Sequence, residues 1–513
     1  MPLKRPSETS IICFFLFGLL PFVYLPVSQD PELTLRYFML TVLLVSIGIL
    51  MIFRKLPITT HFWKEPVLLT FGGYLVVTIL SLTKTINFGD GVYELTKIMV
   101  CFFFLLLMIQ LLRNRPDWIS KLPLFVTFAA FAFSIIGLFQ FIPMIIDTLS
   151  HGTVFAIKNN VTSTLSNKNF FAETLVIALP FSVYTFICHK SYLRWGALFT
   201  AIISFLLILI IQSASAYFAI AIQIIVAIFF LFIYRKLFRN TALFILYKTR
   251  FLVFTAIAFL IIPVSILVFF PDKIDYSQLP RKWVAIKAYV KAPDKIFEKD
   301  NVKNNNSVYD RLFLARNSIL MAKENPILGN GVANWKILYP KFGLYGNNFM
   351  SVGTLRFEHP HNDYLLVLCE SGILGLLSWL AFLSFILITT VRNIKKSEHP
   401  DIRILLFLLL LSLISFVCTS LFGYPKERFF SMLLLLCLTA IIVALKETKP
   451  QTLKSSNKIF LFFSVGILIT ISWIHLERYR SEIYVNAALL QQKKKCLFTN
   501  ATTNRKSKKV LSK

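Results

Sequence analysis

The sequence predicts an all-α polytopic membrane protein with about 12–13 transmembrane helices and one large outer loop. Two observations predict this fold class. Hydrophobic residues make up 56% of the 513 residues and charged residues only 15%, against roughly a quarter charged in an ordinary soluble domain. Apolar segments long enough to cross a bilayer also alternate with short breaks that hold most of the lysines and arginines.

The same composition excludes several other classes of protein. A soluble nucleic-acid binder could carry the net charge of +29, but not this much continuous apolar sequence, so no nucleic-acid partner is expected. A disordered chain would be polar. Seven cysteines spread thinly over the whole length do not suit a disulfide-rich secreted domain.

The apolar segments fall into an N-terminal group within residues 1–270 and a C-terminal group within residues 363–475. The first segment is expected to be a retained helix, because it lacks a small-residue cleavage site and further spans follow it. The break at 212–215 is very short, and the last segment is also compatible with an interfacial helix. The expected spans are 11–28, 35–53, 66–83, 95–112, 122–147, 169–188, 195–212, 214–234, 251–270, 363–390, 404–422, 429–445 and 458–475.

Residues 271–362 form the one large loop, in which two helices are expected, at 281–292 and at 308–324. Asn325-Pro326 ends the second helix, because a residue before proline disfavours helical geometry. A polar patch lies at 301–307. The basic tail at 476–513 ends in Lys-, Asn-, Thr- and Ser-rich sequence and is expected to be disordered.

The distribution of basic residues predicts the orientation. With the N-terminus in the cytoplasm, the inside loops hold about three times as many lysines and arginines as the short outside loops, and every alternate loop agrees. This orientation places residues 271–362 on the outer face of the membrane.

An outer location limits the chemistry that the large loop could perform. ATP and nucleotide sugars are absent there, so a synthetic enzyme needs a donor that was activated inside and carried across on a lipid. A lipid diphosphate meets that need, and the planar fork of arginine binds phosphate oxygens in pairs. A hydroxyl acceptor needs a base that is neutral near pH 7, which suits histidine. Arg281, Arg311 and Arg316 with His361 would form a set of groups for transfer onto a hydroxyl.

Each of these residues also has a simpler interpretation. Basic residues of an outer loop commonly face solvent or lipid headgroups. Arg311 follows Asp310 and could pair with it, and His361 could be a cap or turn residue. Asp363 could be only the N-cap of the next span.

Glu370 stands apart, because it lies about seven residues into an apolar helix, where an acid is expected to have a functional or paired role. It shares a helix face with Asp363 and lies opposite His361, so it is expected to orient or pair with an arginine. Gly372 and Gly375 are expected to allow close helix packing.

Metal and cofactor sites are not expected. Of the seven histidines only His359 and His361 cluster, and the large loop contains no cysteine. Neither a P-loop nor a dinucleotide-binding fingerprint is present.

Several blocks of the sequence resemble the O-antigen ligase and O-antigen polymerase family. The most specific is His359-Pro-His-Asn-Asp363, followed by Glu370-Ser-Gly-Ile-Leu-Gly375. It is preceded by Ser307-Val-Tyr-Asp-Arg311, by Asn325-Pro-Ile-Leu-Gly-Asn-Gly331 and by Asn334-Trp335. Upstream, Ser166-Asn-Lys-Asn-Phe-Phe-Ala172 looks like the Asn-rich motif that opens a middle helix of that family. The resemblance covers roughly residues 160–445.

The resemblance implies a GT-C-like membrane ligase in the bacterial inner (cytoplasmic) membrane, with the large loop in the periplasm. Such enzymes transfer a glycan, such as O-antigen, from undecaprenyl diphosphate to a hydroxyl of a glycolipid or other acceptor, without metal or nucleotide. By motif position, His361 would be the base, Glu370 a structural or orienting acid and Arg311 a diphosphate contact. The further residues expected at the substrate are Arg281, Arg316, Asn362, Asp363, His359 and Asn169.

The chain departs from the family pattern at two places. Relatives often have an arginine that helps to hold the diphosphate where this chain has Ala214, in Gln212-Ser-Ala-Ser-Ala-Tyr217. Either another cation compensates, or activity is weak or lost. Some relatives also continue into tetratricopeptide-like helices, and 477–492 could begin one before the sequence turns basic.

Three functions remain open from the sequence. A ligase and a polymerase that extends the carrier-linked glycan share these motifs. A transporter or flippase would require inverted repeats, broken helices and several charges within the membrane. The sequence indicates no repeat and few buried charges.

Overall fold

The computed structural model describes residues 8–510 except 29, 55–64, 152–160, 240, 242–306, 343–356 and 446–454. Within these ranges all regular structure is helical, and 10 helices are long and apolar enough to cross a membrane. The predicted all-α polytopic membrane fold is therefore confirmed. The expected span at 251–270, the loop helix at 281–292 with Arg281, and most of the polar patch at 301–307 lie outside the described residues.

The helices follow one another along the chain with short connections. In order they are α1 (Glu8–Phe14), η1 (Phe15–Leu19), η2 (Leu20–Phe22), α2 (Leu33–Arg54), α3 (Pro66–Ser81), η4 (Leu82–Lys84), α4 (Phe88–Asn114), η5 (Pro116–Trp118), α5 (Leu122–His151), α6 (Lys168–Cys188), α7 (Leu193–Ile211), α8 (Ala214–Ile233), α9 (Arg235–Phe238), α13 (Ser307–Glu324), α14 (Trp335–Leu338), η9 (Tyr339–Phe342), α16 (Asp363–Lys396), α17 (Pro400–Thr419), η10 (Pro425–Glu427), α18 (Phe429–Ala444) and α19 (Ser455–Val510). Each expected span other than 251–270 overlaps one of these helices.

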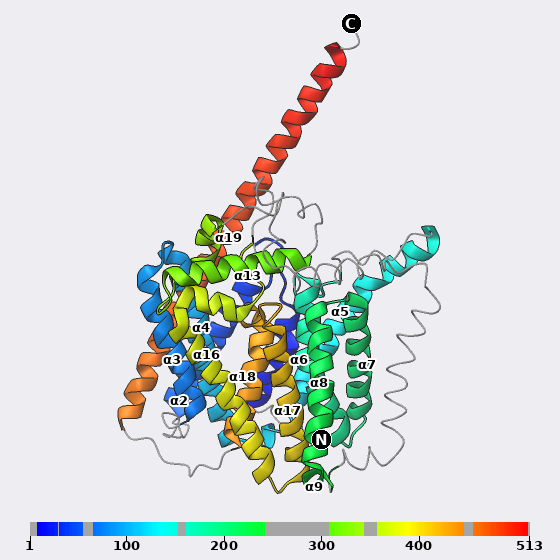
Figure 1. Ribbon diagram of the computed structural model, residues 1–513, viewed down its shortest axis with the longest axis vertical. Helices are drawn as coiled ribbons and strands as arrows, with labels where there is room; N and C mark the ends of the chain where they lie inside the picture. Colours follow the sequence, from blue (N-terminus) through cyan, green and yellow to red (C-terminus); the bar gives the residue numbers. More distant parts are fainter. Residues whose placement is uncertain are drawn as a thin grey trace.

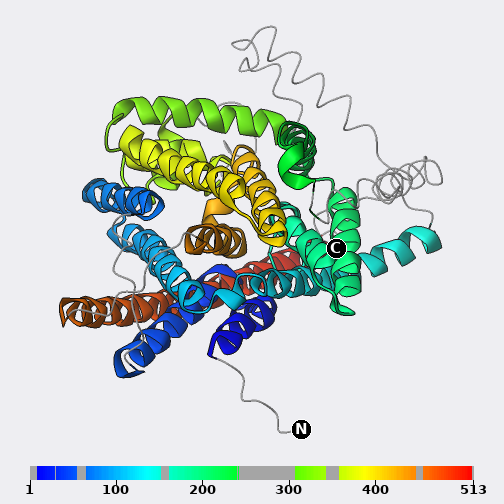
Figure 2. The ribbon, with the colours of Figure 1, turned by 90° about the horizontal axis from the view of Figure 1, so that it is seen from below.

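Helix α18 lies in the middle of the bundle, ringed by other helices in the view of Figure 2. All of its residues from Phe429 to Val443 are buried. A helix that is apolar on every side favours such an interior position. By contrast, α8 leaves large apolar side chains exposed, as a lipid-facing helix does: Ile224, Ile225, Ile228, Phe229 and Phe232.

Hydroxyl groups join the central helices. The Thr174 and Ser431 hydroxyls lie 3.2 Å apart between α6 and α18, and Ser412 of α17 donates to the Ile177 carbonyl of α6 at 2.6 Å. Helices in a bilayer gain no hydrophobic energy from one another, so interhelical hydrogen bonds help to set their packing. These bonds connect α6 to the two helices that flank the candidate site.

Helix α13 crosses one end of the bundle, which is here called the α13 end (Figure 1). It begins at Ser307 and ends at Glu324, in agreement with the helix predicted at 308–324. A small apolar cluster fixes it to α16 and α14 and includes Leu314, Trp335 and Cys369. The Trp335 indole N–H also donates to the Ser318 hydroxyl of α13 at 2.9 Å.

The turn after α13 lies against the backbone of α16. Gly329 has a φ of +76° and Gly372 a φ of +65°, and a Cβ on Gly372 would lie 2.2 Å from the Ile327 carbonyl oxygen. The close approach expected at Gly372 is thus to a loop rather than to another helix. At Gly375, which is buried, the three atoms nearest to an added Cβ belong to Ser371 and Val367 of α16 itself.

Helix α19 runs without a break from Ser455 to Val510 and projects beyond the bundle at the α13 end (Figure 1). The sequence predicts a disordered tail from residue 476. Two contacts with the bundle hold the helix in place just past that point. Arg478 donates to Asp90 at 2.6 Å, and Glu482 accepts from the Thr34 hydroxyl at 2.8 Å.

Candidate active site

The segment before α16 places two histidines at the α13 end. His361 adopts a φ of +55°, which is uncommon for a residue with a side chain. Its ring lies 5.2 Å from the ring of Tyr424 and 6.0 Å from that of Phe357, while the His359 ring lies 4.7 Å from Tyr424. The motif therefore presents His361 from a bend just before α16, where its ring is half-buried between aromatic neighbours.

Both histidines are neutral at pH 7. Burial, together with the positive charges of Arg311 and Arg428, lowers the pKa of His361 to about 4. Burial also lowers the pKa of His359 to about 3, against the opposing effect of Glu427. A neutral imidazole can accept a proton, so His361 has the protonation state that a general base requires.

Arg311 of α13 is a cation whose positive charge acts on His361. Its side chain is half-buried, and no hydrogen bond or ion pair joins its guanidinium to a residue within the described ranges. Burial lowers its pKa, and Glu173 opposes that effect more than the adjacent Asp310 does. A partly buried guanidinium without a bonded partner is suited to binding an anion. Arg316 is exposed further along α13 and is not among the charges that act on His361.

Arg428 is a second cation near His361, to which the sequence analysis assigned no role. Its guanidinium stacks 3.9 Å from the centre of the Phe170 ring, and it pairs with Asp30 at 3.2 Å and with Glu32 at 3.3 Å. These contacts hold it in one place. The signal for it in the sequence is the charged stretch Lys426-Glu-Arg428, which lies between two apolar spans.

Glu173 of α6 is the second residue that sequence analysis missed. Its side chain is buried, and its Oε1 accepts from the Ser215 hydroxyl of α8 at 2.7 Å. The charges of Arg311 and Arg428 both act on it. It directly follows the Asn-rich motif, so its place one residue into the apolar part of α6 was a usable signal.

The other motif residues at the helix starts have mainly local contacts. Asn362, and not Asp363, is the N-cap of α16, because its side chain accepts from the backbone N–H of Leu365 at 3.0 Å. At α6 the cap is Asn167, which accepts from the backbone N–H of Asn169 at 2.8 Å. The Asn169 side chain itself is half-buried.

Asp363 joins α16 to the connection between α17 and α18. It is fully buried, and its Oδ2 accepts from the Ser420 hydroxyl at 3.1 Å and from the backbone N–H of Lys426 at 2.9 Å. These bonds fix the position of the segment that carries Tyr424 and Arg428. Asp363 thus stabilises the segments that carry the site residues, and it is not the N-cap of α16.

Glu370 faces a different part of the interior from His361. Its Oε1 accepts from the backbone N–H of Trp335 at 3.2 Å, and its carbonyl accepts from the Ser81 hydroxyl and from the Gly331 N–H. It lines a small cavity together with Lys426 and other polar residues. The structure therefore places Glu370 where it holds the turn after α13 against α16.

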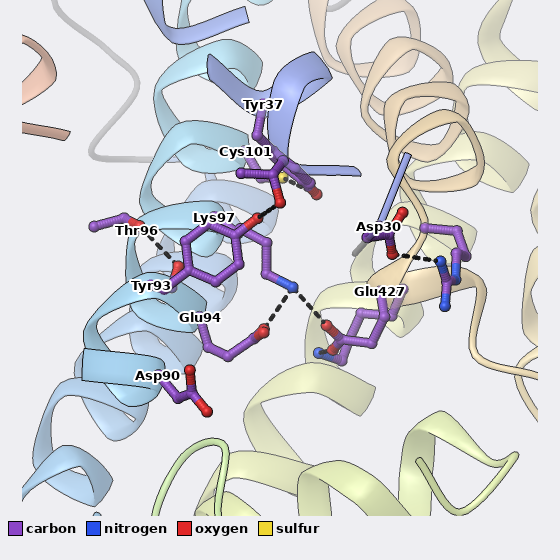
Figure 3. Close-up of polar contacts among 12 residues, drawn as sticks. Asp30, Tyr37, Asp90, Tyr93, Glu94, Thr96, Lys97, Cys101 and Glu427 are labelled. Carbon is purple, nitrogen blue, oxygen red and sulfur yellow. Dashed lines mark hydrogen bonds and ion pairs between the residues drawn. The ribbon is translucent and has the colours of Figure 1, made fainter. Parts of the chain in front are cut away.

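That cavity adjoins a buried cluster of charges, shown in Figure 3. The Lys97 ammonium lies 2.6 Å from Glu94 and 3.2 Å from Glu427, and Lys426 also pairs with Glu427. The expectation of few buried charges is therefore wrong. These ion pairs join two lysines to two glutamates, so each charge in them has a partner of opposite sign. Among the described residues no group of His, Cys, Asp or Glu side chains is arranged to hold a metal ion.

One comparison with known proteins finds a related family. The family model described as O-antigen ligase matches residues 199–380. The matched region runs from α7 into α16, so it contains Ala214, Arg311, His361 and Glu370. No curated protein matches the chain.

Proposed function

We propose that this chain, whose residues 199–380 match the family model described as O-antigen ligase, transfers a lipid-diphosphate-linked glycan onto an acceptor hydroxyl. The match supports a membrane protein of the glycan ligase or polymerase type; the donor, the acceptor and the site residues are our proposal. One observation carries it. The guanidinium of Arg311, which has no hydrogen bond or ion pair with a described residue, and the fixed guanidinium of Arg428 both act on His361, a histidine that is neutral at pH 7.

These groups suit glycosyl transfer. The acceptor hydroxyl gives its proton to the His361 imidazole while its oxygen forms the new bond to the anomeric carbon. The bond from that carbon to the diphosphate breaks, and its electron pair stays on the departing lipid diphosphate. Arg311 stabilises the charge that develops there, because its planar donors match phosphate oxygens.

Arg428 offers an explanation for the missing arginine at position 214. Ala214 is exposed at the start of α8, beside Ser215, which bonds to Glu173. Arg428 reaches the same neighbourhood from the connection between α17 and α18, since it acts on both Glu173 and His361. We infer that it supplies the cation that relatives place on the preceding helix.

The proposed setting is the bacterial inner membrane, with the α13 end facing the periplasm. The bias of lysines and arginines toward alternate loops supports this orientation. A donor carried across on undecaprenyl diphosphate or a similar lipid would then meet His361 at the outer surface, and a glycolipid is a suitable acceptor.

Substitutions of His361 and Arg311 test the proposal in cells that depend on this gene for surface polysaccharide. His361→Ala should lower transfer roughly 100-fold or more, because the base is lost. Arg311→Gln should lower it by roughly 100-fold, with only partial recovery in Arg311→Lys, which lacks the paired donors. Lys323→Gln, which changes an exposed cation in the last turn of the same helix, is the matched control and should transfer normally. Normal glycan from the His361 and Arg311 variants, at normal protein level, would refute the site.

A polymerase is the alternative within the same family type. The inactive variants distinguish the two functions through the material that accumulates. Loss of a ligase leaves long polymer on the lipid carrier, whereas loss of a polymerase leaves single repeats on the acceptor. Introducing Ala214→Arg tests the role given to Arg428: a gain in activity would show that Arg428 does not replace the missing arginine.

A further inference from the structure

A chain of charged side chains links the segment before α2 to Arg428. The Arg428 Nη1 atom lies 3.2 Å from Asp30 Oδ2 and 3.3 Å from Glu32 Oε1. The other oxygen of Glu32, Oε2, lies 3.0 Å from Nη1 of Arg36, whose side chain is fully buried. Arg36 in turn donates to the Thr164 carbonyl at 3.0 Å and to its hydroxyl at 3.1 Å. Arg428 is therefore tied to two segments that precede the region matched by the family model.

Each of the two carboxyl groups divides its oxygens between a local partner and Arg428. Asp30 Oδ1 accepts from the backbone N–H groups of Glu32 at 3.2 Å and Leu33 at 3.1 Å, at the start of α2, and Oδ2 contacts Arg428. Glu32 serves Arg36 with one oxygen and Arg428 with the other. Burial raises the pKa of Glu32 and the two arginines lower it, but a carboxyl group offers an acceptor oxygen in either protonation state.

Ring contacts place Arg428 beside the two histidines of the candidate site. Its guanidinium lies 5.0 Å from the centre of the Tyr424 ring and 3.9 Å from that of Phe170. The same Tyr424 ring lies 5.2 Å from the His361 ring and 4.7 Å from the His359 ring. The Arg428 Nε is buried with no hydrogen-bond partner among the described residues, so the contacts at Nη1 and the two rings set the orientation of the guanidinium.

We propose that Asp30 and Glu32 are positioning residues for the glycosyl transfer: they hold Arg428 beside Tyr424, where its guanidinium meets the donor diphosphate. The inference rests on the proposed function, which gives Arg428 its diphosphate. A guanidinium binds phosphate oxygens in pairs only when its planar donors are correctly oriented, and the two carboxyl groups fix one of its nitrogens. The segment before α2 is thus part of the active site, although it carries none of the motifs that resemble the family.

Amide variants remove the contacts with Arg428 and keep the local ones. In Asp30→Asn the side-chain oxygen stays with the backbone N–H groups at the start of α2, and the NH2 group, which cannot accept, faces Arg428. Glu32→Gln acts in the same way between Arg36 and Arg428. Each variant should lower transfer by roughly tenfold or more in membranes from cells that depend on this gene, because small displacements of a substrate-binding group slow a reaction strongly.

Combining these variants with Arg428→Gln separates positioning from a general structural role. Arg428→Gln alone should lower transfer by roughly 100-fold. If both carboxyl groups act through Arg428, adding Asp30→Asn or Glu32→Gln to it should change transfer by no more than about twofold. A merely structural role would lower transfer by the same factor in both backgrounds.

Glu65→Gln is the matched control. It changes a buried carboxyl group that pairs at 3.1 Å with Arg113, in the last turn of α4. This pair lies roughly 35 Å along the helix from Asp90 in the first turn, which contacts Lys336 of α14 at the α13 end. The control loses a comparable ion pair far from the site, so its transfer should be unchanged at equal protein level.

The outcomes separate this inference from the proposed function. A loss of transfer in both amide variants that disappears in the Arg428→Gln background supports the positioning role. Normal transfer in the amide variants, or an equal loss in both backgrounds, overturns it. Normal transfer in Arg428→Gln overturns it together with the role given to Arg428, while His361→Ala and Arg311→Gln, measured alongside, still decide the proposed function. If Glu32→Gln does not fold, Asp30→Asn alone decides, because the Asp30 side chain is 30% exposed.

Discussion

Replacing Gly372 by alanine places a methyl group inside the backbone contact between α16 and the turn after α13. The added Cβ would lie 2.2 Å from the Ile327 carbonyl oxygen and 2.6 Å from the Gly329 nitrogen, where no side chain can move aside. Gly372 also has φ 65° and ψ −168°, a conformation that only glycine adopts readily. The variant must therefore change the backbone on one side of this contact.

The expected loss of stability follows from the structure. The unusual backbone conformation costs about 1–3 kcal/mol with a side chain present. Beside it, Ile373 donates to the Pro326 carbonyl at 2.8 Å and Leu374 to the Ile327 carbonyl at 3.3 Å, and each bond contributes about 1 kcal/mol. Together these effects predict a loss of about 3–5 kcal/mol for Gly372→Ala.

Thermal unfolding of the purified protein in detergent, followed by tryptophan fluorescence, measures this loss. The apparent Tm of Gly372→Ala should fall by roughly 5 °C or more. Gly196→Ala is the control, because Gly196 lies in α7 with no neighbouring atom within 4 Å of an added Cβ. Its Tm should stay the same or rise slightly, since alanine favours helix. Equal Tm values for the two variants would refute the close backbone approach at Gly372.

Three further variants or conditions test the interior of the protein by thermal unfolding in the same assay. The pKa values of His359 and His361 lie below the usual 6.5, so the unfolded chain takes up protons before the folded protein does as the pH falls. The contribution of the two histidines to stability is therefore complete above pH 6.5 and declines as the pH falls toward 4. His359→Gln should flatten this decline, and an unchanged pH profile would contradict the burial of these histidines. Lys97→Met should lower the free energy of unfolding by about 3 kcal/mol, because it leaves a buried carboxylate without a counter-charge. Adding Glu94→Gln should restore at least half of that loss. No recovery would mean that the Lys97–Glu94 pair is not the cause. Asp363→Ala should lower the free energy of unfolding by about 1–3 kcal/mol, because two hydrogen-bond donors lose their acceptor. Asp363→Asn keeps an acceptor oxygen and should destabilise the protein less. A larger loss in Asp363→Asn than in Asp363→Ala would rule out these hydrogen bonds.

Most of the fold could be predicted from the sequence because hydropathy and helix-ending signals are local. The span at 169–188 matches α6, and the loop helix predicted at 308–324 matches α13 within one residue. The helical course of α19 beyond residue 476 could not be predicted, because it depends on partners such as Asp90 that lie far away in the chain. The sequence suggested Asp363 as the N-cap of α16, whereas the cap is Asn362, because both side chains can cap a helix and only the fold decides which one does.

In the candidate site, too, some features could be predicted from the sequence and others depend on the tertiary structure. The sequence by itself determined the membrane fold and the motif that carries His361 and Arg311, because apolar length and short motifs are properties of neighbouring residues. Only the tertiary structure decided that Arg428 and Glu173 join them, since these residues come from distant segments that helix packing brings together. Burial makes His361 neutral at pH 7, and burial arises only when the helices have packed.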